Sequence, residues 1–348
     1  MAEAAESRVA VASILLLALG LVLSFYVAWC LGANDAANPT ECAVGSGATT
    51  LRQALVLFSA FAALGALTHG FMVIKTIGTG VVQDVTLLGS VTVILSACLW
   101  ITVCTWKGLP ISTTHSIIGS VLGYGFTRSL LYGGAGVRWG VMGGIGIAWV
   151  ASPVLAALLA ALLYRIMVAW LPSRRNPEQV AKHILMFALC FSAFAFGAND
   201  VGNATGVFFS VASKTGEIPR TLSLLGLAVL GSTGIAVGAF TWGYRVINTV
   251  GFKITRLDYV MGGAAELSNA TAVYLFTTLP FLIFGWGMPI STTLASVGSV
   301  IGVGMARNFR TVSRGMVLRI VAGWLFTVPS CAVISGVSFW LAAGTLGP

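Results

Sequence analysis

Long apolar segments dominate the chain and are separated by short polar stretches. A run of about 20 apolar residues is long enough to cross the hydrocarbon core of a bilayer as a helix. The pattern therefore predicts ten membrane elements. They cover residues 8–33, 51–74, 84–106, 109–128, 139–170, 182–212, 219–247, 258–285, 287–306 and 316–343.

One conspicuous polar stretch, "LPSRRNPEQVAKH" at 171–183, divides the chain into two halves. We expect a first unit at 1–170, a cytoplasmic linker at 171–182 and a second unit at 183–348. The first apolar segment lacks the small-residue cleavage pattern of a signal peptide, so it is expected to remain as a membrane helix.

The two halves repeat each other. "GANDAAN" at 32–38 recurs as "GANDVGN" at 197–203, and "PISTT" at 110–114 recurs at 289–293 in the same order. With five elements in each half, the second copy must enter the membrane in the opposite direction. The sequence thus predicts an all-α polytopic membrane protein of two inverted repeats, with broken or re-entrant helices that meet at mid-membrane.

Composition agrees with this fold class and excludes others. The chain of 348 residues is 57% hydrophobic and 8% charged, whereas soluble domains are about 25% charged. Little length remains for a catalytic domain outside the membrane. Its net charge of +9 comes from short basic clusters between apolar segments, which is typical of membrane topology rather than of nucleic-acid binding. The six cysteines show no metal-ligand spacing.

The distribution of basic residues favours one orientation, with both termini outside the cell. The cytoplasmic set is then Arg52, Lys107, Arg165, Arg174, Arg175, Lys182, Arg245, Lys253, Arg256, Arg307, Arg310 and Arg314. The outer set is Arg8, Lys75, Arg128, Arg138, Lys214 and Arg220. If the elements at 84–106 and 109–128 form a re-entrant hairpin instead of two spans, Lys107 lies at the tip of that hairpin. The two termini then still lie on the same side of the membrane.

The repeated motifs contain helix breakers and polar groups at membrane depth. Gly32 and Gly197 weaken their helices, and the neighbouring Asn and Asp side chains compete for backbone hydrogen bonds, so each segment is expected to break there. Pro110 and Pro289 suit the first turn of a new half-helix. Two such N-termini, each with a Ser-Thr-Thr sequence, would bind a small tetrahedral oxyanion, although the hydroxyls could also simply cap the helices.

Asp35 and Asp200 would repel an anion unless they are protonated or neutralised by cations. Carboxylate and amide oxygens from Asp35, Asn38, Asp200 and Asn203 are suitable ligands for a hard cation. Such a cation would remove the repulsion and couple its own binding to that of the anion.

On these motifs, the chain resembles the PiT-type inorganic phosphate transporters, the ion-coupled phosphate permeases. The resemblance implies a homodimer in the plasma membrane, without enzymatic activity or cofactor, that moves inorganic phosphate with sodium ions or protons. It implies phosphate binding by Asp35, Ser112, Thr113, Thr114, Asp200, Ser291, Thr292 and Thr293. It implies cation binding by Asn34, Asp35, Asn38, Asn199, Asp200, Asn203 and Glu266.

Several positions depart from the family pattern. His115 follows the first "PISTT", but Leu294 follows the second. Ala62 stands where many members carry an acid, and a second acid is missing around Gly89 and Ser90. Glu266 keeps the counterpart of that second acid, and Glu41 is expected to face water in the cavity. These departures leave the number of coupled cations open.

Three other functions compete with phosphate transport as readings of these motifs. An intramembrane serine protease requires a GxSG turn, but Val44 replaces the first glycine in "VGSG" at 44–47. A passive anion channel would not need paired Asp residues that repel the permeant ion. A sulfate or other oxyanion permease of the same fold stays open as the alternative. Phosphate at neutral pH keeps a proton that an ionised Asp accepts and sulfate does not, so the paired Asp residues favour phosphate.

Overall fold

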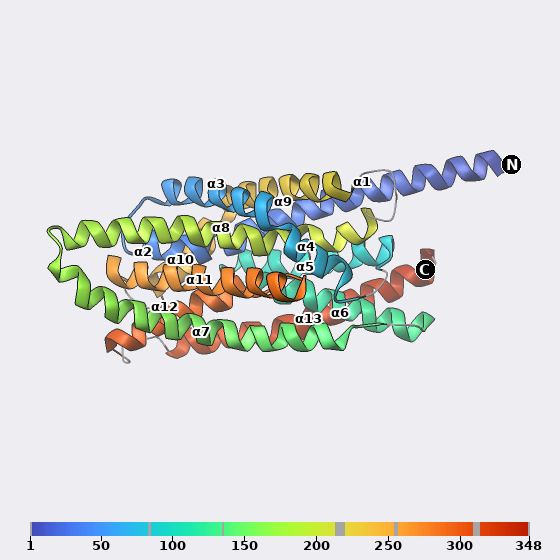
Figure 1. Ribbon diagram of the computed structural model, residues 1–348. Helices are drawn as coiled ribbons and strands as arrows, with labels where there is room; N and C mark the ends of the chain where they lie inside the picture. Colours follow the sequence, from blue (N-terminus) through green and yellow to red (C-terminus); the bar gives the residue numbers. More distant parts are fainter. Residues whose placement is uncertain are drawn as a thin grey trace.

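The computed structural model describes residues 2–82, 85–133, 136–212, 220–253, 257–308 and 314–346, and nearly all of them are helical. Figure 1 shows an elongated bundle whose long helices run along one common direction. The α-helices are α1 (Ala2–Asp35), α2 (Ala37–Gly45), α3 (Leu51–His69), α4 (Phe71–Thr79), α5 (Leu87–Trp106), α6 (Thr113–Tyr132), α7 (Trp139–Trp170), α8 (Pro177–Ala212), α9 (Arg220–Trp242), α10 (Tyr244–Lys253), α11 (Tyr259–Phe284), α12 (Thr292–Asn308) and α13 (Arg314–Leu346).

Each of the ten expected elements corresponds to one long helix. The short helices α2, α4 and α10 prolong α1, α3 and α9, and α8 begins five residues earlier than expected. Among the described residues, eight helical segments are long and apolar enough to span a bilayer. Helices α6 and α12, which follow the two "PISTT" motifs, are not among those eight. The protein is therefore an integral membrane protein.

Both termini lie at one end of the bundle, and the segment that joins α7 to α8 lies at the other (Figure 1). We call the second end the linker end. Of the basic residues used to assign the orientation, Lys214, Arg256 and Arg310 lie outside the described residues. Termini at one shared end agree with an even number of crossings.

Helices of the two halves pack mainly on each other. Helix α1 packs on α9 and α3 on α8, while α6 packs on α13 and α7 on α12. Glycines permit the closest of these approaches. A Cβ atom on Gly32 would overlap the carbonyl oxygen of Ile235, and one on Gly197 would overlap that of Ala62. The repeated glycines thus allow two backbones to meet, and they do so in matching places.

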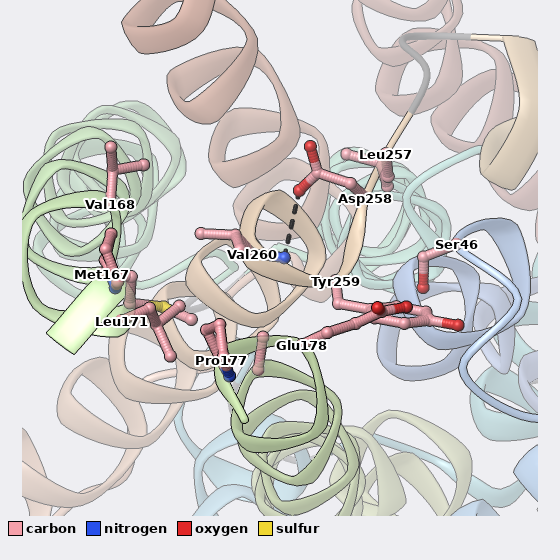
Figure 2. A pocket seen from close by; sticks show the side chains of 12 residues that line it. Ser46, Met167, Val168, Leu171, Pro177, Glu178, Leu257, Asp258, Tyr259 and Val260 are labelled. Atoms are coloured by element: carbon pink, nitrogen blue, oxygen red, sulfur yellow. Dashed lines mark hydrogen bonds between the residues drawn. The ribbon is translucent and has the colours of Figure 1, made fainter. Parts of the chain in front are cut away.

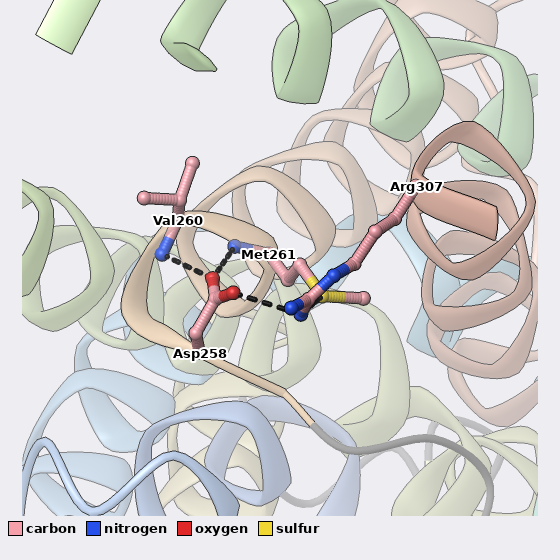
Figure 3. A network of polar contacts seen from close by, with 4 residues as sticks. All are labelled: Asp258, Val260, Met261 and Arg307. Atoms are coloured by element: carbon pink, nitrogen blue, oxygen red, sulfur yellow. Dashed lines mark hydrogen bonds and ion pairs between the residues drawn. The ribbon is translucent and has the colours of Figure 1, made fainter. Parts of the chain in front are cut away.

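Helices α5 and α6 form one helical hairpin, and α11 and α12 form another. The first is closed at its base by a bridge between Val82 and Val137. At the linker end, the second is closed by an ion pair of 2.9 Å between Arg307 and Asp258 (Figure 3). Helix α12 lies toward the linker end and α6 toward the opposite end (Figure 1). The hairpins therefore enter the bundle from opposite sides.

The break expected in the first motif is present, since Ala36 separates α1 from α2, although its backbone stays near-helical, with φ −57° and ψ −20°. The break expected in the second motif is wrong. Helix α8 runs unbroken through Gly197 and Asp200, and Gly197 packs closely on α3. Pro110 and Pro289 do not lie in the first turn of a helix either, since α6 and α12 begin three residues after them.

Candidate functional site

The two Asn-Asp motifs lie on α1 and α8, and their first asparagines hold the tips of the two hairpins. Asn34 donates to the carbonyl oxygen of Leu109 (3.1 Å) and accepts from the backbone N–H of Ile111 (3.3 Å). Asn199 donates to the carbonyl oxygen of Ile290 (2.9 Å) and accepts from its N–H (3.2 Å). Each amide therefore pairs with backbone groups that the non-helical tip would leave without a partner.

The serine of each "PISTT" motif caps the helix that follows. Ser112 Oγ accepts from the N–H of His115, and Ser291 Oγ accepts from the N–H of Leu294, both at 3.1 Å. An N-cap satisfies one of the free N–H groups in the first helical turn. The N-termini of α6 and α12, each with a partial positive charge of about 0.5, are thus fixed beside the two aspartates.

The aspartate carboxylates receive hydrogen bonds from hydroxyl and amide groups. Thr113 donates a short hydrogen bond to Asp35 Oδ2, and Thr293 Oγ1 lies 3.5 Å from Asp35 Oδ1. Asp200 accepts from Asn203 Nδ2 at 2.8 Å, and Thr292 also lies within hydrogen-bonding reach of it. The two carboxylates are close enough to interact electrostatically with each other. Two acidic side chains therefore lie beside the N-terminal ends of α6 and α12.

The second asparagine of each motif reaches across to the hairpin of the other half. Asn38 Nδ2 donates to the hydroxyls of Thr292 (3.2 Å) and Thr293 (3.1 Å). Asn203 Nδ2 donates to the hydroxyl of Thr114 at 2.9 Å. The threonine hydroxyls also bond the hairpin tip of the other half. Thr114 donates to the carbonyl oxygen of Ile290, and Thr293 donates to that of Ile111 (3.1 Å). One site is thus built from both halves.

This centre is closed to solvent on all sides. None of the twelve residues involved is more than 3% exposed: Asn34, Asp35, Asn38, Ser112, Thr113, Thr114, Asn199, Asp200, Asn203, Ser291, Thr292 and Thr293. Buried carboxylates that lack a basic partner are costly and are typical of ion-binding sites in membrane proteins. The arrangement offers hydroxyl and N–H donors for an oxyanion, with carboxylate and amide oxygens nearby for a cation.

The remaining predicted site residue, Glu266, lies apart from the centre. It is on α11 and hydrogen-bonds with Asn269 (3.3 Å), and Ser192 and Cys42 also lie within its reach. His115 packs against Trp149 with the two rings tilted by 52° and their centroids 3.9 Å apart, which agrees with a packing role. Glu41 was expected from the sequence to face water in the cavity, but it is only 1% exposed. The signal that could have found it is a carboxylate six residues after Asp35.

The chain is similar to proteins described as phosphate transporters. A family described as "Phosphate transporter family" matches residues 31–188 and 169–335. The chain is 32% identical to "Putative phosphate permease PF1020" of Pyrococcus furiosus, over 93% of this chain and 95% of that protein. It is 30% identical to "Inorganic phosphate transporter 2-1, chloroplastic" of Arabidopsis thaliana, over 92% and 71%. A solved structure, "The sodium-dependent phosphate transporter", is 30% identical with a TM-score of 0.85, over 95% and 100%.

Proposed function

This chain belongs to the phosphate transporter family, whose members are permeases and not enzymes, and we propose that it imports inorganic phosphate by secondary active transport. Sodium ions or protons are the coupling ions, and the site is exposed to each side of the membrane in turn. The observation that carries this proposal is the meeting of two capped helix N-termini with Asp35 and Asp200 at one buried centre. Phosphate would be held there by Ser112–Thr114 and Ser291–Thr293.

We further infer that residues 1–170 and 183–348 are inverted repeats joined by the 171–182 linker. Three observations support this inference: the exchange of helix partners between the halves, the matched glycine contacts and the hairpins that enter from opposite ends. Two related hairpins can move in opposite senses around a fixed centre, which is how alternating access works in such folds.

Bound cations would offset the repulsion between the two carboxylates and phosphate at this centre. Two carboxylates and a phosphate anion would repel one another strongly in a buried site. Sodium ions or protons at Asp35, Asn38, Asp200 and Asn203 would remove that repulsion, so phosphate and cation would bind together. Asn34 and Asn199 contact hairpin backbone, so their role in the proposal is to position the tips.

Transport into proteoliposomes tests the proposal. We expect phosphate uptake to rise when a sodium or a proton gradient is imposed separately, and sulfate to compete poorly because it brings no proton for an aspartate to accept. Equal uptake of sulfate would favour the general oxyanion permease. Uptake that follows the phosphate gradient alone would contradict secondary active transport.

Coupling also predicts a reciprocal change in affinity. If a cation raises the affinity for phosphate by some factor, phosphate must raise the affinity for the cation by the same factor. The measurement is phosphate binding to purified protein with and without sodium and at two pH values, followed by sodium binding with and without phosphate. A phosphate affinity that is the same under all these conditions would contradict a shared centre.

Loss of a single hydroxyl should weaken phosphate binding moderately. Thr113→Ala removes one neutral donor from the first turn of α6, which is worth about 1 kcal/mol, or roughly a fivefold loss of phosphate affinity. The cation response should remain. Thr113→Ser restores the hydroxyl and is the matched control. If Thr113→Ala binds phosphate as tightly as the serine variant, this side chain is not part of the site.

We also propose a location and an assembly. The twelve-to-six distribution of basic residues in the sequence favours both termini outside, so the linker end would face the cytoplasm. The plasma membrane is the location that the family resemblance implies. A homodimer in the lipid bilayer is the assembly that the family resemblance implies. Chemical labelling of single cysteines placed in the linker, from either side of intact cells, tests the orientation.

A further inference from the structure

A groove lies between α3 and α8, apart from the central site. Both helices begin at the linker end (Figure 1), and they meet closely where a Cβ atom on Gly65 would overlap the carbonyl oxygen of Phe194. Between the linker end and that contact, the two helices leave two recesses of about 830 and 600 Å³. Leu57 and Met186 line both recesses, so the two form one continuous feature, which we call the α3–α8 groove.

The recess nearer the linker end, which we call the head recess, is lined by basic and polar side chains. Arg52 and Gln53 come from the first turn of α3, and Gln179, Lys182 and His183 come from the start of α8. In the described part of the chain, no carboxylate pairs with Arg52, Lys182 or His183. The N-termini of α3 and α8 add partial positive charge at the same end. The head recess therefore favours an anion that can accept hydrogen bonds from these groups.

The second recess, which we call the tail recess, is apolar and has no charged side chain in its lining. Phe61 and Leu64 line it from α3, and Phe187, Cys190 and Phe191 line it from α8. Phe187 is 65% exposed, so the tail recess opens onto the surface of the bundle. An open apolar recess on a membrane helix matches the chemistry of a hydrocarbon chain.

The length of the groove matches one leaflet of a bilayer. The stretch of α8 from Lys182 to Phe194 rises about 18 Å, and the stretch of α3 from Arg52 to Leu64 rises about as much. One leaflet contributes about 15 Å to the hydrocarbon core. The basic end of the groove would therefore lie at headgroup depth, and its apolar end would lie near the middle of the membrane.

Another cavity at the linker end has the opposite charge. Its volume is about 670 Å³, and Glu178 and Asp258 are in its lining (Figure 2). Asp258 is paired with Arg307, whereas Glu178 would repel an anion. Glu178 lines this cavity while Gln179 and Lys182 line the head recess, so α8 separates the two. The chemistry that suits an anion is therefore on the α3 side of α8.

We propose that the α3–α8 groove binds one anionic phospholipid, with its headgroup phosphate in the head recess and one acyl chain in the tail recess. A free phosphate ion would occupy the head recess alone, whereas a phospholipid matches both parts of the groove. Basic pockets between membrane helices are typical sites for anionic headgroups. The proposal goes beyond phosphate transport and does not depend on it, because the groove and the central site share no residue.

Native mass spectrometry of the purified protein tests the site. The protein is titrated with phosphatidylglycerol and with phosphatidylcholine of the same acyl chains, and bound lipids are counted by their mass. The wild-type protein should bind the first phosphatidylglycerol more tightly, because phosphatidylcholine has no net charge. Arg52→Gln and Lys182→Gln should each weaken that binding about fivefold, and the double variant roughly 25-fold. Binding of phosphatidylcholine should stay unchanged.

Arg165→Gln is the matched control. Arg165 is an exposed basic residue near the linker end of α7 and outside the groove, so this variant should bind phosphatidylglycerol as the wild-type protein does. Melting temperatures without added lipid show that each variant is folded. If Arg165→Gln weakens binding as much as Arg52→Gln, the preference reflects overall charge and not a site, and the inference is overturned.

Two further measurements distinguish the lipid from other occupants. An excess of inorganic phosphate or glycerol phosphate should not displace phosphatidylglycerol, and displacement would mean that the head recess binds small anions instead. A phosphatidylglycerol with a photoreactive acyl chain should label residues 57–64 and 186–194, and labelling confined to other segments would overturn the inference. If phosphatidylglycerol binds to the monomer but not to the dimer, a second copy covers the groove, and the inference is also overturned. None of these measurements involves transport, so the proposed function is tested separately.

Discussion

Asp200→Asn is expected to reduce gradient-driven phosphate uptake steeply while the protein stays folded. The asparagine keeps the size of the side chain and one acceptor oxygen for Asn203, which donates to Asp200 Oδ1 at 2.8 Å. It removes the charge that would hold a cation. Since interactions with a charged group are worth about 1.5–3 kcal/mol, uptake at limiting cation should fall roughly 10- to 100-fold. Stability should be kept or raised, because an ionisable group is costly at membrane depth.

The measurement is uptake per folded molecule, with the melting temperature taken on the same preparation. Asp35→Asn should give a similar but unequal loss, because Thr113 and Thr293 surround Asp35 whereas two asparagines and Thr292 surround Asp200. A merely structural Asp200 predicts the reverse: a lower melting temperature with near-normal uptake by the molecules that remain folded. Substantial gradient-driven uptake by the double asparagine variant would exclude the coupling mechanism.

Gly197→Ala is expected to destabilise the whole bundle. The new methyl group would overlap the backbone carbonyl of Ala62 on α3, and a backbone atom cannot rotate away as a flexible side chain can. Overpacking of this kind costs about 1–3 kcal/mol and should lower the melting temperature by several degrees. Gly32→Ala should behave similarly, because its methyl group would overlap the carbonyl of Ile235 on α9.

Gly226→Ala is the matched control for these glycine variants. Gly226 lies in α9, and a Cβ atom there would meet no atom within 4 Å. Alanine has the higher helix propensity, so this variant should be as stable as the wild-type protein or more so. Equal melting temperatures for Gly197→Ala and Gly226→Ala would mean that α3 and α8 are not packed as described.

The sequence alone predicted the helices and the chemistry of the central site, because both depend on local patterns. Apolar runs of bilayer length identify membrane helices wherever they occur. The duplicated "GAND" and "PISTT" motifs placed Asp35 and Asp200 in related positions, and in the structure these two carboxylates are electrostatic neighbours at one buried centre. Their roles in binding phosphate and cations stay a prediction.

Features that depend on contacts between distant helices were not predictable in this way. A glycine beside Asn and Asp favours a break locally, yet Gly197 lies in an unbroken helix because α3 approaches it closely. The burial of Glu41 depends on α11 and α12, which follow it by more than 200 residues. Asn34 and Asn199 looked like cation ligands, but each bonds the backbone of a hairpin tip whose fold the sequence pattern did not show.

The ribosome makes the first half of this protein before it makes the second-half helices that pack on that half. Helices α1, α3, α6 and α7 are made first, and they pack on α9, α8, α13 and α12, which are made later. Until then, the polar side chains of Asp35 and Asn38 lack the second-half threonines that they contact in the finished protein. A chain that stops in the linker therefore lacks the hydroxyl partners of the Asn38 amide, while Thr113 of the first half can still donate to Asp35. The central site is complete only after α12, which carries Thr292 and Thr293, has been inserted against α7.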